Sequence, residues 1–175
     1  MIISKAIKMK KKHLKLLQMT HVEFPSCFHQ IAKQIGHIRG LKNKYNGRPS
    51  KYDRGNKNAF VDTVGVLGEL IFLHYLVESN IEFEMVNLVD NYSTKKADFI
   101  VNNVRIDVKC KFNKYKSFII NKEAHEKGKG FIDYYVMVHV QNQTCAELHK
   151  FHYSEVDKWE DKKLKYATAK HFDFR

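Results

Sequence analysis

Two aspartates and one lysine in the middle of the chain have types and spacings that suit chemistry on a phosphate. Asp98 precedes the short apolar run 99–101, and Asp107 and Lys109 lie in the alternating run 104–112. Carboxylate oxygens are the ligands that a hard divalent cation such as Mg2+ prefers, and such a site needs no Cys or His. A lysine ammonium beside the carboxylates could stabilise charge that develops on a phosphate or an attacking water.

A predicted hairpin brings these side chains together. Asn102 and Asn103 separate the two apolar runs, and Asn suits a two-residue turn because it tolerates positive φ. With these residues as the loop, Asp98 lies opposite Asp107, and Lys109 shares a face with Asp107 because side chains alternate along a strand. Like charges that face each other across two strands are destabilising. A cation bound by both carboxylates would offset this repulsion, so Mg2+ is the expected cofactor, with Mn2+ as a substitute.

Glu69 is a third carboxylate that calls for an explanation. It lies in the apolar stretch 64–77, where an unpaired charge would be costly. A lone Glu in such a stretch is usually on the exposed stripe of a surface helix. Here Gly65 and Gly68 precede it, and each Gly inside a helix costs about 1 kcal/mol relative to Ala. The two glycines indicate close approach of backbone or a sheet, and they favour Glu69 as a site residue.

The remaining pattern predicts an α/β protein that carries this hairpin. Apolar spacing predicts helices over 20–39 and 59–79, separated by a polar loop over 40–58. The expected strands cover residues 81–89, the hairpin 97–112, and residues 117–121, 132–141 and 144–153. A helix or turn runs through 128–130, and a capping box at 154–157 opens a last short helix.

The positive charge of the chain is concentrated in its first third. The net charge is +12, and residues 1–60 hold 14 Lys or Arg against two acids, whereas residues 61–175 hold 17 against 17. This imbalance predicts a polyanionic partner, because Lys and Arg that neutralise phosphates release counterions. A solubilising tail is the simpler alternative. An anionic membrane surface is less favoured, since no aromatic apolar face accompanies the lysines.

Several side chains are candidates for nucleic-acid contact. Four lie in the basic loop, one lies on the strand that carries Asp107 and Lys109, and two follow that strand, where an ordinary polar role is the alternative. The candidates are Arg48, Lys51, Arg54, Lys57, Lys111 and Asn121, with His125 beside them.

The cysteine and histidine patterns predict neither disulfides nor zinc. Cys27, Cys110 and Cys145 are odd in number and far apart, which favours a reducing, cytoplasmic location. The N-terminus lacks the uninterrupted apolar segment of a signal peptide, and the apolar stretch 64–77 is shorter than a membrane span. None of the ten histidines lies in a His-Glu-x-x-His or Cys-x-x-Cys context, and no phosphate-binding Gly-rich loop is present.

Taken together, these motifs resemble the PD-(D/E)XK nuclease superfamily, which has a restriction-endonuclease-like fold. The residues that carry the resemblance are Gly68-Glu69, Ala97-Asp98 and the run from Arg105 to Lys111. The later runs 118–121 and 133–138 are similar in their order, and the likeness covers roughly residues 58–160. Ala97 stands where the family has proline, which leaves the carboxylate in place.

The resemblance implies a role for each residue. Asp98 and Asp107 would bind Mg2+ with the backbone carbonyl of Val108, Lys109 would orient or activate water, and Glu69 would support the metal. The implied fold is a central mixed sheet flanked by helices, formed by residues 58–175 as the nuclease core. A basic, mainly helical extension over 1–57 would precede it, and the two parts together would form one compact domain.

The expected activity is therefore Mg2+-dependent hydrolysis of phosphodiester bonds, with DNA favoured over RNA by the resemblance alone. A nucleic-acid-binding protein that keeps the fold without catalysis is the first alternative, although the complete set of acids and lysine argues against it. A nuclease toxin that acts on tRNA is the second. The sequence leaves the oligomeric state open, including a homodimer.

Overall fold

The computed structural model describes residues 20–45, 58–85, 88, 97–112, 117–164 and 167–173. Two groups of predictions lie outside these residues. One is the helical nature of the extension before residue 20, and the other is the basic loop with Arg48, Lys51, Arg54 and Lys57.

The described part of the chain alternates helices and strands. Its helices are α2 (Phe28–Tyr45), α3 (Asn58–Glu78), α4 (Lys122–Gly128) and α5 (Tyr153–Asp157). Its strands are β1 (Thr20–Glu23), β2 (Phe83–Met85), β3 (Phe99–Val101), β4 (Val104–Phe112), β5 (Ser117–Asn121), β6 (Tyr134–Val140), β7 (Cys145–His152), β8 (Glu160–Lys163) and β9 (Thr168–Asp173).

The strands form a larger mixed sheet and a smaller antiparallel one. The order in the larger sheet is β1-β7-β6-β4-β3-β2, and the smaller sheet has the order β5-β9-β8. Only β4 and β6 pair in parallel, whereas the other neighbours in the larger sheet are antiparallel. Parallel neighbours need a crossover connection. Here β5 and α4 lie in that connection, and they bring the smaller sheet to the larger one.

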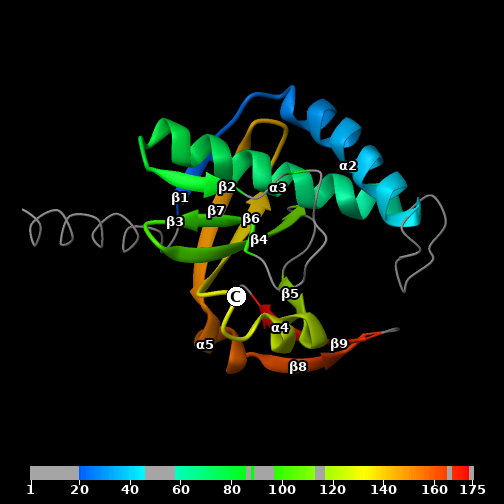
Figure 1. Cartoon of the computed structure of the whole chain (residues 1–175), viewed down its shortest axis with the longest axis vertical. Coiled ribbons are helices and arrows are strands. Elements are labelled where there is room, and N and C mark those ends of the chain that lie inside the picture. The colour runs from blue at the N-terminus through cyan, green and yellow to red at the C-terminus, as the bar shows by residue number, and fades with distance from the viewer. Residues whose placement is uncertain are drawn as a thin grey trace, which may run out of the picture.

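The larger sheet is covered on both faces. Figure 1 shows α2 and α3 on one side of it, and α4 with the smaller sheet on the other. The core on the α3 side includes Leu67, Ile71 and Phe72. The core on the other side joins Phe118 of β5 to Tyr135 of β6. This double coverage explains why β6 is buried along most of its length, as its unbroken β-branched and aromatic run predicts.

Glycines permit the closest helix contacts. A Cβ atom on Gly68 would lie 2.5 Å from the Cβ of Cys110 on β4, and one on Gly36 would lie 2.6 Å from the backbone nitrogen of Thr63. Gly36 therefore allows α2 to pack on α3, and Gly68 allows α3 to pack on β4. The close approach of a sheet that the glycines before Glu69 predict is confirmed at Gly68.

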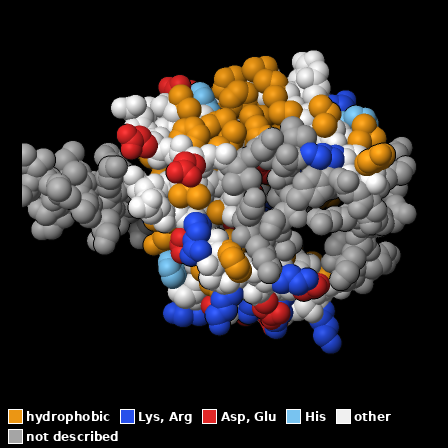
Figure 2. All heavy atoms as spheres, in the orientation of Figure 1, with side chains coloured by type: hydrophobic (Ala, Val, Ile, Leu, Met, Phe, Trp, Pro, Cys, Tyr) orange, Lys and Arg blue, Asp and Glu red, His pale blue; other side chains and the backbone are white. Residues whose placement is uncertain are grey.

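The surface differs between the two layers. Figure 2 shows hydrophobic side chains gathered over the helix layer, and lysine and arginine side chains over α4 and β8. Exposed hydrophobic residues of α2 and α3 include Ile38, Leu41, Phe60 and Val61.

The hairpin has the predicted register. Asn102 and Asn103 form the turn with φ of 51° and 65°, and Val101 pairs with Val104, Ile100 with Arg105 and Phe99 with Ile106. Strands β6 and β7 are antiparallel neighbours, as predicted.

Three predicted boundaries are wrong. The helix predicted from Thr20 begins at Phe28, because residues 20–23 pair with β7 instead. The strand predicted from Ile81 begins at Phe83, because the Ile81 amide donates to the Leu76 carbonyl in the turn after α3. The last capping box uses the side chain of His152 rather than that of Ser154. Strands β8 and β9 were not predicted.

The apolar stretch of α3 is also longer than predicted. Residues Phe60–Glu78 have a mean hydropathy of 1.6 and are long and apolar enough to cross a membrane by length and composition. Within this fold, α3 packs between α2 and the larger sheet, which accounts for its apolar character.

Candidate active site

Asp98 is fixed at the end of the hairpin by two backbone contacts. Its amide donates to the Ile106 carbonyl at 2.9 Å, and its Oδ2 atom accepts a hydrogen bond from the Val108 amide at 2.7 Å. Because β3 begins at Phe99, the side chain of Asp98 takes the place of a strand partner for Val108. The N–H and C=O of a strand residue point to the same neighbour. The Val108 carbonyl therefore lies on the Asp98 side of β4.

Asp107 and Lys109 form an ion pair on the same face of β4. The Lys109 Nζ atom lies 2.5 Å from Asp107 Oδ2, and the two side chains are 40% and 13% exposed. Among the described residues, no hydrogen bond of good geometry reaches this buried Oδ2 atom, whose contact is the ion pair. The site thus contains a buried carboxylate oxygen paired with a lysine whose side chain is partly exposed.

The charges around Asp98 act on its carboxyl group. Burial is the largest cause that raises the pKa of Asp98 well above its usual value, and Asp107 and Glu69 raise it further. Lys109 and the Val108 hydrogen bond oppose this shift without cancelling it. The repulsion between Asp98 and Asp107 that the hairpin register predicts is therefore present in the fold.

Lys109 keeps its proton in this setting. Burial by itself would lower the pKa of Lys109, but the charges of Asp107 and Asp98 outweigh it and the pKa is raised. The side chain is consequently a permanent cation and hydrogen-bond donor rather than a base.

Glu69 is held in a buried ion pair with Arg39. The guanidinium of Arg39 donates from Nη1 to Glu69 Oε1 at 3.0 Å and from Nη2 to Oε2 at 2.8 Å. Both residues are buried, at 4% and 6% exposure, and Arg39 Nε donates to the Leu88 carbonyl at 2.8 Å. Both carboxylate oxygens of Glu69 thus accept hydrogen bonds from Arg39. Glu69 acts on the site through its charge, which raises the pKa of Asp98.

Arg39 is a site residue that the sequence analysis missed. It lies on α2, 30 residues before Glu69. The signal was present, because Arg39 falls on the same helical face as the buried Ala32 and the half-buried Ile35. An arginine on an apolar face needs a buried partner, and Glu69 on the apolar helix is the matching acid.

The other predicted contact residues have varied surroundings. Lys111 lies with Nζ 4.4 Å from the centre of the Phe118 ring, and burial lowers its pKa to about 8. The Asn121 side chain accepts a hydrogen bond from the Ala124 amide and caps α4. His125 is buried, and its ring nitrogens lie 3.0 Å from the Tyr135 hydroxyl and 2.9 Å from Asp157 Oδ1. These contacts give Asn121 and His125 structural partners.

A pocket adjoins the site between β4 and β5. It has a volume of about 260 Å3 and is lined by Lys109, Cys110, Lys111, Ser117, Phe118, Ile119 and Met137. Two lysines thus face a space bordered by an aromatic ring. The Cys110 thiol stays protonated, because burial raises its pKa to about 12.

No protein-family model matches this chain, and no curated protein is similar enough in sequence to count as a relative.

Proposed function

We propose that the protein is a Mg2+-dependent nuclease of the PD-(D/E)XK kind that hydrolyses phosphodiester bonds in DNA. The observation that carries the proposal is the convergence of Asp98, Asp107 and Lys109 at one end of the β3-β4 hairpin, with Glu69 close enough to act on Asp98. Two acids and a lysine in this arrangement suit phosphoryl chemistry better than a purely structural role, because a buried carboxylate oxygen lies next to a lysine whose side chain is partly exposed.

The arrangement of the elements supports a restriction-endonuclease-like core. Helix α3 precedes the antiparallel strands β2, β3 and β4, and a crossover through β5 and α4 leads to the parallel strand β6. The order is the one that the sequence resemblance implies. It places Glu69 on the helix and both aspartates at the hairpin, on the elements where the family carries its acids.

The donor set fits a magnesium ion. Asp98, Asp107 and the Val108 carbonyl offer oxygen ligands only, as a hard cation prefers. Burial and the neighbouring carboxylates disfavour the ionised form of Asp98 and raise its pKa, and a bound cation would favour that form. When bound, the ion would polarise a phosphoryl oxygen and lower the pKa of a coordinated water.

The side chains have separate roles in this proposal. Lys109 keeps its proton, so it would donate to a non-bridging phosphate oxygen and stabilise the charge that develops there. Its partly exposed side chain lines the pocket next to Lys111, where a substrate phosphate could lie. Arg39 and Glu69 would hold α2 against α3, and the charge of Glu69 would act on Asp98.

The basic first third of the chain supports a polyanionic substrate. Residues 1–60 hold 14 Lys or Arg, and cations of this kind bind a phosphate backbone independently of sequence. DNA is the substrate that we infer from the family resemblance, and Mn2+ would replace Mg2+ because both accept oxygen ligands.

The test is cleavage of a panel of linear, nicked and branched duplex DNA, single-stranded DNA and tRNA, with Mg2+ or with EDTA. We expect DNA cleavage that needs the ion and is lost in Asp107→Asn, whereas Asp173→Asn, an acid on β9, serves as the matched control and remains active. Binding without cleavage under every condition would support the non-catalytic alternative. Cleavage confined to tRNA would support the toxin alternative.

A further inference from the structure

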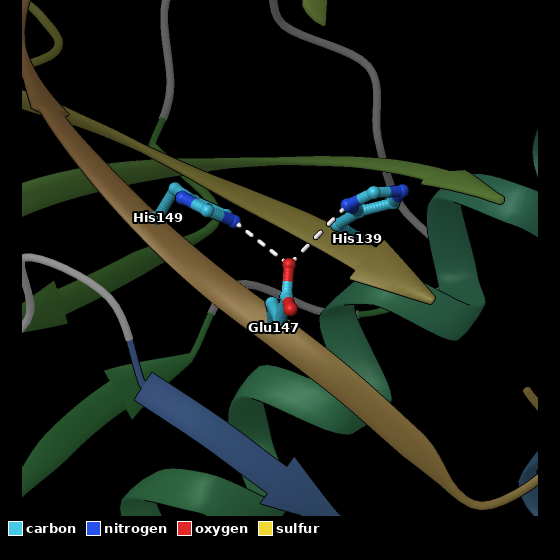
Figure 3. Close-up of side chains that lie close together, drawn as sticks. All are labelled: His139, Glu147 and His149. Carbon is cyan, nitrogen blue, oxygen red and sulfur yellow. Dashed lines mark hydrogen bonds and ion pairs between the residues drawn. The ribbon is translucent and has the colours of Figure 1, made fainter. Parts of the chain in front are cut away.

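A second group of polar side chains lies on β6 and β7, where His139 is paired in register with Lys111 of β4, four residues beyond Tyr135, the partner of Asp107. His139 on β6 is paired in register with Glu147 on β7, and His149 follows Glu147 by two residues. Directly paired residues share a face of the sheet, as do residues two apart on one strand. Figure 3 shows the two imidazoles converging on the carboxylate of Glu147, which lies between them.

The spacing of these groups matches metal coordination. Glu147 Oε2 lies 3.5 Å from His139 Nδ1 and 3.4 Å from His149 Nε2. The three ligand atoms all lie within 4.8 Å of one another. Zinc bonds of about 2.0–2.1 Å in a tetrahedron place neighbouring ligand atoms about 3.3–3.4 Å apart. The two separations from Glu147 are close to this value, and a rotation that brings the imidazoles together would replace the contact between Gln141 Nε2 and His139 Nδ1, which lie 3.1 Å apart.

The surroundings hold these side chains in place. His139 and His149 are 12% and 11% exposed, and the ring of Phe118 packs against both at 6.2 and 5.3 Å between centroids. The two strands that carry them are central in the larger sheet, so their backbones are fixed by ladders on both sides. Burial also lowers the pKa of both imidazoles, which keeps them in the neutral form that binds metal.

A fourth donor is available on the neighbouring strand. His21 on β1 is paired in register with Glu147, and its Nδ1 atom lies 3.9 Å from Glu147 Oε1. The His21 side chain is 72% exposed, so it can change rotamer without disturbing the core. Three adjacent strands thus present nitrogen and oxygen donors along one row of the sheet.

We propose that His139, Glu147 and His149 bind a divalent transition-metal ion such as Zn2+, with His21 or water as the fourth ligand. Imidazole donors favour Zn2+, Cu2+, Fe2+ or Ni2+ over Mg2+, so this site differs in chemistry from the oxygen-only set at Asp98 and Asp107. The bound ion ties β6 to β7, and it stabilises the native sheet whether or not the chain is a nuclease.

The experiment is a titration of the metal-free full-length protein with Co2+ and with Zn2+. Co2+ is followed by the visible absorption of a four-coordinate site, and Zn2+ by calorimetry. The wild type and the control His37→Gln, which changes an exposed histidine of α2, should bind one ion equally. His149→Gln and Glu147→Gln should each bind at least about tenfold more weakly, since even the loss of an outer-shell partner costs 10–100-fold.

Further measurements separate this site from the acidic one. Asp107→Asn should bind Co2+ as the wild type does, millimolar Mg2+ should not displace the ion, and Zn2+ should raise the Tm of the wild type but not of His149→Gln. Circular dichroism establishes that each variant is folded, and Glu147→Gln replaces His149→Gln if the latter is not. A wild type without four-coordinate Co2+ absorption, or folded ligand variants that bind as the wild type does, would overturn the proposal and leave the three groups as a hydrogen-bonded cluster.

Discussion

The Arg39–Glu69 pair and the Asp107–Lys109 pair both act on Asp98, yet they differ in their access to solvent. The side chains of Arg39 and Glu69 are 5% and 8% exposed, and both carboxylate oxygens of Glu69 are hydrogen-bonded. Lys109 is 40% exposed, and Asp107 retains an oxygen without a well-formed hydrogen bond among the described residues. The Arg39–Glu69 pair, called the sealed pair below, has no oxygen left for a ligand. The Asp107–Lys109 pair, called the open pair, has one.

The difference in exposure suggests that one pair has a structural role and the other binds a ligand. A sealed ion pair joins the two helices and gives α3 a fixed position, because separating its charges in the interior is costly. An open pair can exchange one partner for a substrate phosphate or a metal ion at a lower cost. Variants of the two pairs should therefore act on different observables, with stability for the first and catalysis for the second.

The largest effect on stability is expected from removing one partner of the sealed pair. Arg39→Met leaves the Glu69 carboxylate buried and unpaired, which typically costs about 3–5 kcal/mol. The double variant Arg39→Met with Glu69→Leu should recover most of this loss, because apolar residues of similar volume can replace a buried pair. Urea unfolding measures both variants. A single variant that unfolds like the wild type would mean that Glu69 is not sealed in solution.

The next effect concerns catalysis by the open pair. Lys109→Ala should lower kcat by about 10²–10³-fold, the loss typical for one preorganised donor at a developing charge. Its melting temperature should fall less than that of Arg39→Met, because the Lys109 side chain is 40% exposed whereas Arg39 is sealed in the interior. Lys129→Ala, at an exposed position after α4, is the matched control. Equal activity of the two variants on a cleavable DNA would remove Lys109 from the mechanism.

Local patterns in the sequence were sufficient to predict the open pair. The Asn102-Asn103 turn and the alternation over β4 fix the register, and the register alone places Asp98 near Asp107. These signals lie within 15 residues of one another. Gly68 likewise signals the close approach of α3 to β4, although the sequence does not show which strand is approached.

Long-range contacts account for what the sequence did not reveal. Strand β1 exists because residues 20–23 pair with β7, more than 120 residues away, and isolated residues 20–24 fit a helical spacing as well. Strand β8 reads Glu-Asp-Lys-Lys and has no apolar alternation, so only its pairing with β9 makes it a strand. The sequence marks Glu69 and Arg39 separately, because each is a charged residue on an apolar helix face. It does not show that they pair, because only the packing of α2 on α3 brings them together.

Substitution of the two glycines of α3 tests whether the close packing of α3 on β4 stabilises the fold. Gly68→Ala would place a Cβ atom 2.5 Å from Cys110 Cβ, and overpacking of this kind costs about 1–3 kcal/mol. Gly65→Ala is the matched control, because its nearest contact would be 3.7 Å from Arg39 and Ala favours a helix by about 1 kcal/mol. We expect thermal unfolding to show Gly68→Ala destabilised and Gly65→Ala neutral or stabilised. A Gly68→Ala protein that is as stable as Gly65→Ala would show that α3 is not packed on β4 at Gly68.

Asp98 lies between the two pairs and should distinguish them by its dependence on ions. Because the pKa of Asp98 is raised in the fold, the native state holds this proton to a higher pH than the unfolded chain does. Ion-free stability should therefore fall as the pH rises from about 4, near the unfolded value, through the folded pKa.

Asp98→Asn removes the fall in stability with rising pH, because an amide does not ionise. Its amide oxygen can still accept the hydrogen bond from the Val108 amide. At neutral pH without divalent ions, the variant should be more stable than the wild type, because it has no buried carboxylate to ionise. At pH below 4 the stabilities of the two proteins should converge.

Added Mg2+ should raise the Tm of the wild type more than that of Asp98→Asn, because binding to the native state stabilises it as RT ln(1 + [L]/Kd). Calorimetric melts at several pH values, with and without Mg2+, measure both effects. An equal Mg2+ shift in the two proteins would exclude Asp98 as a ligand, and the open pair alone would then have to hold the ion.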